Sequence, residues 1–344
     1  MQKISWCLKA RKYIKVGGLD MKYFSDDTKI FPQQLKGAVG AADVNFSPLT
    51  LKSYIESSEN EVIMVVGQAT ADKVLTDEAT LSIMRRIVAN WALEVYANSG
   101  AIRIGDAGIH VEVGQNRSVA SDKKILAFKR DCQELGCKAL EELINTFEVR
   151  SAEFGEWRLS NERKQYFDTL FRSSNEFGPF GGVPITASLY RNIKRQIQFV
   201  QDDYLQPVLG NVLLDKLIGM SVISLNASDS DKRLQRLAMR VVAPMAVAEA
   251  LAYRVVELRN DGVYQKSISA AGSNDNVEEQ SVAGSRALNG LAIKLNSEFE
   301  ANRVKLIKFL TENADDFPTA PVTQKSIYPV QQMNDDPTSN IYFA

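Results

Sequence analysis

The stretch "RVVAP" at Arg240–Pro244 lies in the middle of a long apolar segment, and it matches "RIVAN" at Arg86–Asn90 in the first half of the chain. Aligning the two arginines, at an offset of 154 residues, places apolar residues 87–89 opposite apolar residues 241–243, and it joins "GIHVE" to "GVYQK". Matches that keep one offset over many residues indicate an internal repeat. The register therefore predicts that the second half of the chain repeats the fold of the first.

Two further blocks extend this register. Gly67 in "VVG" pairs with Gly210 in "VLG" at an offset of 143, and Ser121 pairs with Ser285 at an offset of 164. The offset grows only around the polar stretches "NASDSDKR" and "AAGSNDNVEE", where an insertion costs little because surface loops tolerate extra length. We therefore predict a duplicated module. The alternative is two unrelated helical bundles with similar turn residues.

Each half shows the same order of predicted elements: a helix, a short helix, a long apolar helix, a hairpin and a long amphipathic helix. Pro48 after a serine marks one helix start, and Gly100 closes the long apolar helix of the first half. Alternating apolar residues and the turn "GQN" predict a hairpin over 101–120, and a second is predicted over 262–284. The predicted helices cover residues 48–66, 69–75, 79–100, 122–147, 183–210, 211–219, 232–258 (kinked at Pro244) and 285–313.

The fold class that follows is mainly α: two tandem helical-bundle domains of similar topology, each with an inserted β-hairpin, and an extended arm at each end. The leader lacks a helix-length apolar pattern, and the Gly/Pro-rich stretch "NEFGPFGG" separates the halves. The predicted boundaries are an N-terminal arm over 1–47, helical domain 1 over 48–149, a linker with one helix over 150–182, helical domain 2 over 183–316 and a C-terminal arm over 317–344.

Composition excludes several classes of protein. The chain has 344 residues, 45% of them hydrophobic, which is enough apolar material for real cores and excludes a mainly disordered chain. Its 41 basic and 42 acidic residues leave a formal charge of −1, without the basic excess typical of proteins that grip phosphate backbones. No apolar run approaches the roughly 18 residues of a membrane span, and no signal peptide is visible. We expect a soluble protein made in the cytosol.

Reactive and metal-binding side chains are sparse. The three cysteines, Cys7, Cys132 and Cys137, form no CxxC pattern, so we expect reduced thiols rather than disulfides or a zinc site. The single histidine, His110, lies in the first predicted hairpin, and the repeat places Tyr264 at the equivalent position, which argues against catalysis.

Acidic residues and glycine loops give no signature either. The pairs at 141–142, 202–203 and 278–279 are adjacent in sequence, so on a helix their side chains diverge. No phosphate-binding glycine motif is present. The basic stretch "LKARKYIK" at 8–15 fits a protected edge strand better than a nucleic-acid contact. We predict no catalytic, cofactor-binding or metal-binding residues.

The C-terminal tail is unusually apolar, since free chain ends are generally polar and frayed. It carries prolines at 318, 321, 329 and 337 and ends in "NIYFA". A proline-stiffened arm with a terminal apolar cluster predicts docking, either on its own domain or on a neighbouring subunit by strand addition. The candidate interface residues are Ile327, Tyr328, Val330, Ile341, Tyr342 and Phe343.

Several motifs resemble one group of phage proteins. The stretches "FVQDDYLQPVLGNVLLDKLIG", "RVVAPMAVAEAL", "NDGVYQ", "KLIKFLTENADDFP" and the terminal "NIYF" are similar to proteins of phages and prophages of Bacteroidales bacteria. Those proteins look like head–tail connectors, also called adaptor or head-completion proteins. The resemblance covers residues 183–344 best and reaches 48–149 through the internal repeat. The departure is that the helical unit is doubled here.

The resemblance implies a structural virion protein, not an enzyme, that forms a ring between portal and tail around the DNA channel. The expected partners are further copies of itself in a ring that matches a portal (twelve-fold in the expected case), the portal protein, a tail or neck protein, and DNA that passes without sequence-specific binding. No cofactor and no membrane are expected, and the expected location is the virion, assembled in the host cytoplasm. Two alternatives stay open: a helical interaction module unrelated to virions, and a helical enzyme with a dispersed acidic site.

Overall fold

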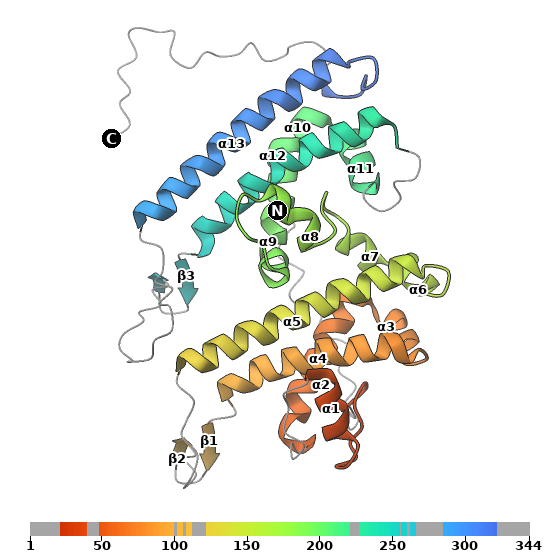
Figure 1. Cartoon of the computed structure of the whole chain (residues 1–344), viewed down its shortest axis with the longest axis vertical. Coiled ribbons are helices and arrows are strands. Elements are labelled where there is room, and N and C mark those ends of the chain that lie inside the picture. Colours follow the sequence, from red (N-terminus) through yellow and green to blue (C-terminus); the bar gives the residue numbers. More distant parts are fainter. Residues whose placement is uncertain are drawn as a thin grey trace. The chain divides into compact units, whose positions relative to one another are not determined.

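The computed structural model describes residues 21–39, 48–99, 102–105, 108–111, 122–220, 227–254, 256–259, 262–265 and 285–321 (Figure 1). The chain divides between Gln165 and Tyr166 into two compact units, called unit 1 and unit 2 below. The described part of the chain is mainly helical, as the sequence predicts. No helix among the described residues is long and apolar enough to span a membrane.

Unit 1 is built around a pair of long helices, α4 and α5, which pack along each other. The shorter helices α1 and α2 pack against α4, and α3 contacts α6. Because α4 is covered by helices on several sides, apolar residues occur nearly all round it, and Ile87, Val88 and Ala92 are fully buried. The helices are α1 (Phe31–Val39), α2 (Pro48–Val66), α3 (Gln68–Val74), α4 (Glu78–Ser99), α5 (Asp122–Val149), α6 (Gly155–Arg158) and α7 (Asn161–Tyr166).

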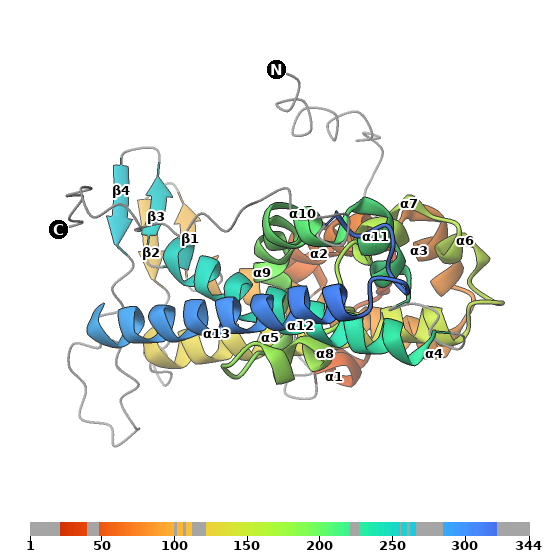
Figure 2. The same cartoon turned by 90° about the horizontal axis from the view of Figure 1, so that it is seen from above.

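Unit 2 is built around α12 and α13, which lie along each other in both views (Figures 1 and 2). Asn302 Nδ2 donates to the carbonyl of Arg240 at 3.1 Å, and Ser230 Oγ lies 2.9 Å from Asp316 Oδ2, so the two helices run antiparallel. Helix α9 packs against α12 on another side. The helices are α8 (Ser174–Phe177), the 3-10 turn η2 (Gly178–Phe180), α9 (Ala187–Val200), the π-helical turn η3 (Gln201–Leu205), α10 (Gln206–Leu209), α11 (Asn211–Met220), α12 (Asp229–Arg254) and α13 (Ser285–Glu312).

Two short antiparallel strand pairs follow the long apolar helices. In unit 1, β1 (Ile102–Gly105) pairs with β2 (Gly108–Val111), and in unit 2, β3 (Val256–Arg259) pairs with β4 (Gly262–Gln265). Their position corrects the sequence analysis, which placed the first turn at "GQN" and assigned residues 256–258 to a helix. In the strand register Gly105 is opposite Gly108 and Arg259 is opposite Gly262, so the two strand pairs correspond residue by residue.

The predicted N-terminal arm needs correction over residues 21–39, because they belong to the core of unit 1. Tyr23, Phe31 and Leu35 are buried. The buried carboxylate of Glu59 on α2 accepts the backbone N–H groups of Lys22 at 3.0 Å and of Tyr23 at 2.9 Å. The one helix of this segment, α1, has nine residues and contains Pro32 and Gly37, so the sequence shows no long helical pattern. Its separate aromatic residues are nevertheless anchored in the core.

The predicted linker over 150–182 also needs correction. It contains α6, α7, α8 and η2 rather than one helix. The aromatic residues Phe154 and Trp157 are buried in unit 1, while Phe171 and Phe177 are buried in unit 2. Short turns rich in glycine and proline look like a linker in sequence, but here they place several aromatic rings in the two cores.

The helix predicted over 183–210 is divided into three parts. Thr186 caps α9 by accepting the N–H of Leu189, so residues 183–186 precede the helix. The π-helical turn η3 then interrupts the α-helical pattern just before Pro207. Proline has no N–H to donate and its ring crowds the carbonyl four residues earlier, which explains a wider turn at this point. Helix α12, by contrast, continues through Pro244.

The start of the predicted C-terminal arm packs on unit 2. Phe317 and Ala320 are buried, and the ring centroid of Phe317 lies 6.0 Å from that of Phe309. The arm expected over 317–344 therefore starts later than predicted, because residues 317–321 complete the core. The remaining tail residues lie outside the described residues.

Candidate functional site

Among the residues that the structure describes, those singled out from the sequence are not brought together in one site. The six candidate interface residues (Ile327, Tyr328, Val330, Ile341, Tyr342 and Phe343) and Cys7 lie outside the described residues. His110 lies in β2, where its Cα is paired with that of Arg103. Cys132 and Cys137 are buried and form no disulfide bond. Burial raises the pKa of the Cys132 thiol to about 11, so this sulfur is not an activated nucleophile.

The acidic pair at 278–279 lies outside the described residues, and the two described pairs are in different units. Glu142 Oε1 on α5 forms an ion pair with Arg86 Nη2 on α4 at 2.6 Å. Asp202 and Asp203 lie in η3 of unit 2. Within the described ranges, no group of three or more His, Cys, Asp or Glu residues could hold a metal ion. The main polar clusters of the two units consist instead of ion pairs and hydrogen bonds that join helices within each unit.

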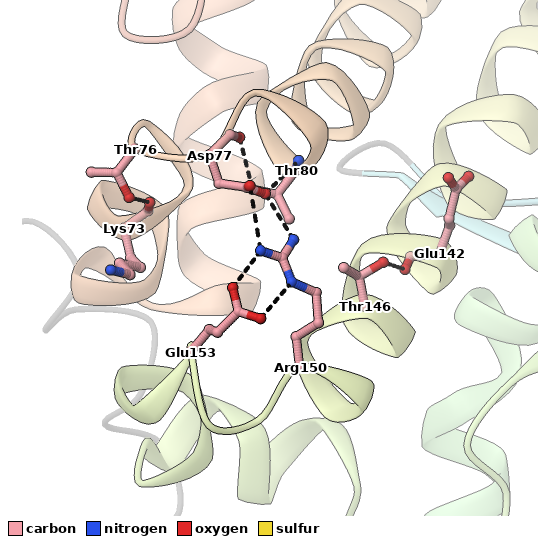
Figure 3. Close-up of polar contacts among 8 residues, drawn as sticks. All are labelled: Lys73, Thr76, Asp77, Thr80, Glu142, Thr146, Arg150 and Glu153. Atoms are coloured by element: carbon pink, nitrogen blue, oxygen red, sulfur yellow. Dashed lines mark hydrogen bonds and ion pairs between the residues drawn. The ribbon is translucent and has the colours of Figure 1, made fainter.

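The densest polar cluster in unit 1 gathers around Arg150, directly after α5 (Figure 3). Its Nη1 donates to Asp77 Oδ2 at 2.9 Å, and its Nη2 donates to Glu153 Oε2 at 2.5 Å. Asp77 also caps α4 by accepting the N–H of Thr80 at 3.0 Å. The guanidinium thus joins the first turn of α4 to the turn that follows α5, 73 residues later in the chain.

Arg150, Asp77 and Glu153 form one ion-pair network, called the Arg150 clamp below. The hydrogen bond from Arg150, helped by the N–H of Thr80, lowers the pKa of Asp77 to about 2. The same guanidinium lowers the pKa of Glu153 below its ordinary value. Both carboxylates are therefore fully charged and fully paired at neutral pH, which suits holding two helices together and leaves neither one available as a general base.

Replacing Arg150 with methionine is expected to raise the pKa of Asp77 from about 2 toward its ordinary 3.8. The native pKa of Asp77 lies below that of the unfolded chain, so the clamp stabilises unit 1 above about pH 4, and this stabilisation is lost as the pH falls through about 2. Urea unfolding at several pH values should therefore show a difference between wild type and R150M that is full at neutral pH and shrinks toward pH 2.

The matched control is Arg158→Met, which removes the same charge from an exposed position of α6. It should change the urea midpoint little at every pH. A difference between wild type and R150M that stays constant from neutral pH to pH 2 would show that Arg150 acts through packing and not through the charged pair.

A second cluster stabilises the end of unit 1. The carboxylate of Glu148 accepts Trp157 Nε1 at 2.7 Å, and it also accepts Nε and Nη2 of Arg163, each at 2.7 Å. The two-point contact with the guanidinium fixes the orientation of both groups. This arrangement holds α6 and α7 against the last turn of α5.

In unit 2 the comparable cluster surrounds Lys194 on α9. Its ammonium group donates to the backbone carbonyl of Tyr166 and lies 3.3 Å from Asp168 Oδ1. Burial lowers the pKa of Lys194, opposed by the charge of Asp168. Gln201 accepts the N–H of Leu170 at 2.8 Å. These bonds attach the segment 166–170 to α9 and to the first residue of η3, and they satisfy polar groups that burial would otherwise penalise.

Sequence reasoning missed these clusters, although one local signal was present. Asp77 followed three residues later by Thr80 is a recognisable helix start, since aspartate is a favoured N-cap. Nothing in the sequence indicates that Arg150 returns to this cap, because the contact depends on how α4 and α5 pack.

One comparison with known proteins gives a match. The model of a family of unknown function, DUF6712, matches residues 47–166 and 205–330. No curated protein and no solved structure matches the chain.

Proposed function

The chain belongs to DUF6712, a family of unknown function, and we propose that its two units are copies of one helical module that serves as a head–tail connector of a tailed phage. The family model matches one segment in each half of the chain. The connector role comes from the motifs quoted above, and the structure supplies features that suit it. The first of these is the similarity between the two units.

Equivalent glycines support the duplication. Gly67 has φ 81° and ψ 149°, and Gly210 has φ 74° and ψ 161°. This part of backbone space is almost restricted to glycine, because a side chain would clash there. Both residues end one helix and begin the next, and they are the pair that the repeat register aligns at an offset of 143.

The strands and the last long helix of unit 1 also correspond to those of unit 2. Moving β1 and β2 forward by 154 residues gives the bounds of β3 and β4. Helices α5 and α13 each have 28 residues, and each is followed by a turn that buries a phenylalanine, Phe154 or Phe317. The N–H of Arg150 donates to the carbonyl of Thr146 at 2.9 Å, and that of Asn313 donates to Phe309 at 3.1 Å, so the turn starts alike in both units.

The proposed function rests on one observation above the others: the strong polar contacts of each unit tie its own helices together. The Arg150 clamp joins the ends of α4 and α5, and Ser230 with Asp316 joins the corresponding ends of α12 and α13. A rigid module of this kind is suited to holding neighbouring subunits. An enzyme would instead require polar groups that converge where a substrate can reach them.

Exposed apolar side chains offer contact points for such neighbours. On α5, Phe128, Leu135 and Val149 are exposed, with Val149 at 76%, and they recur at multiples of seven residues along one face of the helix. Single exposed apolar residues are common, but an aligned row is a feature of surfaces that bind proteins. The proposed assembly is a ring between portal and tail, in the virion, with DNA passing through it without sequence-specific binding.

The test is the mass of the purified full-length protein, alone and mixed with a portal protein, followed by electron microscopy. We expect closed rings, or binding of the protein to portal rings. A protein that stays monomeric and never joins a portal ring would refute the connector role. The duplication is tested separately by whether the experimentally determined units superpose with the same helix connections.

Deleting Ile341–Ala344 is expected to weaken assembly while leaving helix content intact, because these residues form the terminal apolar cluster of the tail. Mass measurement follows assembly, and far-ultraviolet circular dichroism follows helix content. The matched control keeps residues 341–344 and replaces the polar residues Asn334 and Asp335 with alanine. Loss of helicity in the deletion variant would mean that the tail belongs to the core of a unit.

A further inference from the structure

The exposed face at the start of α12 carries four basic side chains. Lys232, Arg233, Arg236 and Arg240 are all exposed. The spacing of three and four residues places Arg233, Arg236 and Arg240 along one side of the helix, and Lys232, four residues before Arg236, borders this row. The row from Arg233 to Arg240 extends about 10 Å along the helix axis. Arg233 also lies over the ring of Phe309, 5.0 Å from its centroid, which holds its guanidinium at the surface.

The three arginines of this row have no acidic partner among the described residues. Lys232 is the one member with an ion pair, to Asp229 at 3.7 Å. The acids on the neighbouring helix α13 are paired with bases of their own helix: Glu298 with Lys294, Glu300 with Arg303 and Glu312 with Lys308. Asp231 on α12 is buried and paired with Lys216. Asp316, which follows α13, accepts a hydrogen bond from Ser230 Oγ at 2.9 Å. Arg233, Arg236 and Arg240 therefore have no ion-pair partner within the described part of unit 2.

The equivalent face of unit 1 shows that the fold does not require this charge. At an offset of 154 residues the four positions are Glu78, Ala79, Ser82 and Arg86, and the first three are exposed as in unit 2. Glu78 pairs with Arg85 at 3.0 Å, and Arg86 pairs with Glu142 at 2.6 Å. The same helix face is thus neutral and internally paired in one unit, and basic without acidic partners in the other.

We propose that the basic face of α12, formed by Lys232, Arg233, Arg236 and Arg240, contacts the phosphate backbone of duplex DNA. The length of the row matches about three base pairs of one strand. Arginine is common in interfaces between proteins, but there it accompanies apolar and aromatic anchors, whereas this row is entirely charged. The planar guanidinium of arginine fits phosphate oxygens at two points, and such contacts carry no base sequence.

This inference rests on the proposed function, in which DNA passes through a ring of subunits. It adds that the basic face of α12 is the surface that faces this DNA. Three or four phosphate contacts per chain are few, so each subunit holds DNA weakly and DNA can still slide. A chain with a formal charge of −1 can therefore still contact passing DNA, because positive charge is concentrated on one face of α12.

The experiment measures fluorescence anisotropy of two labelled duplexes of unrelated sequence with the full-length protein, between about 50 and 200 mM salt. Wild type should bind both duplexes equally, and its affinity should fall about 100-fold over this range, as expected for about four phosphate contacts. The variant R233A/R236A/R240A should bind at least tenfold more weakly at low salt, and the log–log salt slope should lose roughly 2.7 of its magnitude.

The matched control, K294A/R303A/K308A, removes the same number of charges from α13, where each base has an acid partner. It should bind DNA within twofold of wild type. Absence of wild-type binding at low salt, or equal losses in both triple variants, would overturn the proposal. Binding of labelled poly-glutamate through the three arginines without binding of DNA would also overturn it, in favour of an acidic protein partner.

Assembly measurements on the same samples separate the two proposals. If wild type joins portal rings but does not bind DNA, the connector role stands and the basic face is excluded as the DNA contact. If wild type binds DNA through the three arginines but stays monomeric with a portal present, the DNA contact stands and the connector role fails. The circular dichroism spectrum of each variant confirms that it is folded.

Discussion

Replacing Trp157 with alanine is expected to lower the free energy of unfolding of unit 1 by about 3–5 kcal/mol. The side chain is fully buried, its ring centroid lies 5.6 Å from that of Phe147, and its Nε1 donates to Glu148 at 2.7 Å. Truncation removes a large apolar surface and leaves a cavity where α6 meets α5. Glu148 keeps its two bonds from Arg163, so the loss is mainly one of packing.

Tryptophan emission measures this effect directly. All three tryptophans of the chain, Trp6, Trp91 and Trp157, fall within the first 165 residues, so their emission in urea follows unit 1. Trp157→Phe, which keeps a ring but loses the bond to Glu148, should cost less than the alanine variant. The control Leu159→Ala, at a position that is 83% exposed, should stay within about 0.5 kcal/mol of wild type. A loss below 1 kcal/mol in W157A would show that the segment is a dispensable linker.

Replacing Gly136 with valine is expected to destabilise unit 1 by about 3 kcal/mol. Gly136 lies on the buried side of α5 against Trp91 of α4, and a Cβ atom there would lie 2.4 Å from Trp91 Nε1 and 2.5 Å from Cδ1. Both atoms belong to a rigid, buried indole, so the two helices must move apart to admit even a methyl group. The better helix propensity of valine or alanine over glycine recovers less than about 1 kcal/mol of this cost.

The measurement again uses urea unfolding followed by tryptophan emission. Gly136→Ala should be destabilised less than Gly136→Val, because fewer atoms have to be accommodated. The control Gly37→Val adds the same group to helix α1, where a Cβ atom meets nothing within 4 Å. It should change stability by no more than about 0.5 kcal/mol. If both valine variants were equally stable, the contact between Gly136 and Trp91 would not determine the spacing of α4 and α5.

The main helices could be predicted from the sequence because their signals are local. Pro48 begins α2, Gly67 and Gly210 separate pairs of helices, and the apolar positions of α4, α5, α12 and α13 recur with helical spacing. These features depend on residues a few positions apart. The duplication was likewise proposed from sequence, because two similar modules retain similar local signals even where their loops differ in length.

The errors share one physical cause. Residues 21–30 and 150–182 contain short turns with scattered aromatic residues, and α1 over Phe31–Val39 is only nine residues long, so these segments look like an arm and a linker. Whether Tyr23 or Trp157 is buried depends on helices that lie far away in the sequence. Burial of such anchors is a property of the packed unit, and it leaves no periodic pattern in the chain.

The sequence by itself determined the helical class of this protein, the order of its main helices and the glycines between them, because hydrophobic spacing and backbone conformation act over a few residues. Only the tertiary structure decided that Asp77 meets Arg150 and that Gly136 makes room for Trp91. It also decided that three arginines of α12 lack an ion-pair partner among the described residues, while Arg86 of α4 is paired with Glu142. Those facts depend on which side chains from distant segments are brought within a few ångströms, and this is determined by helix packing.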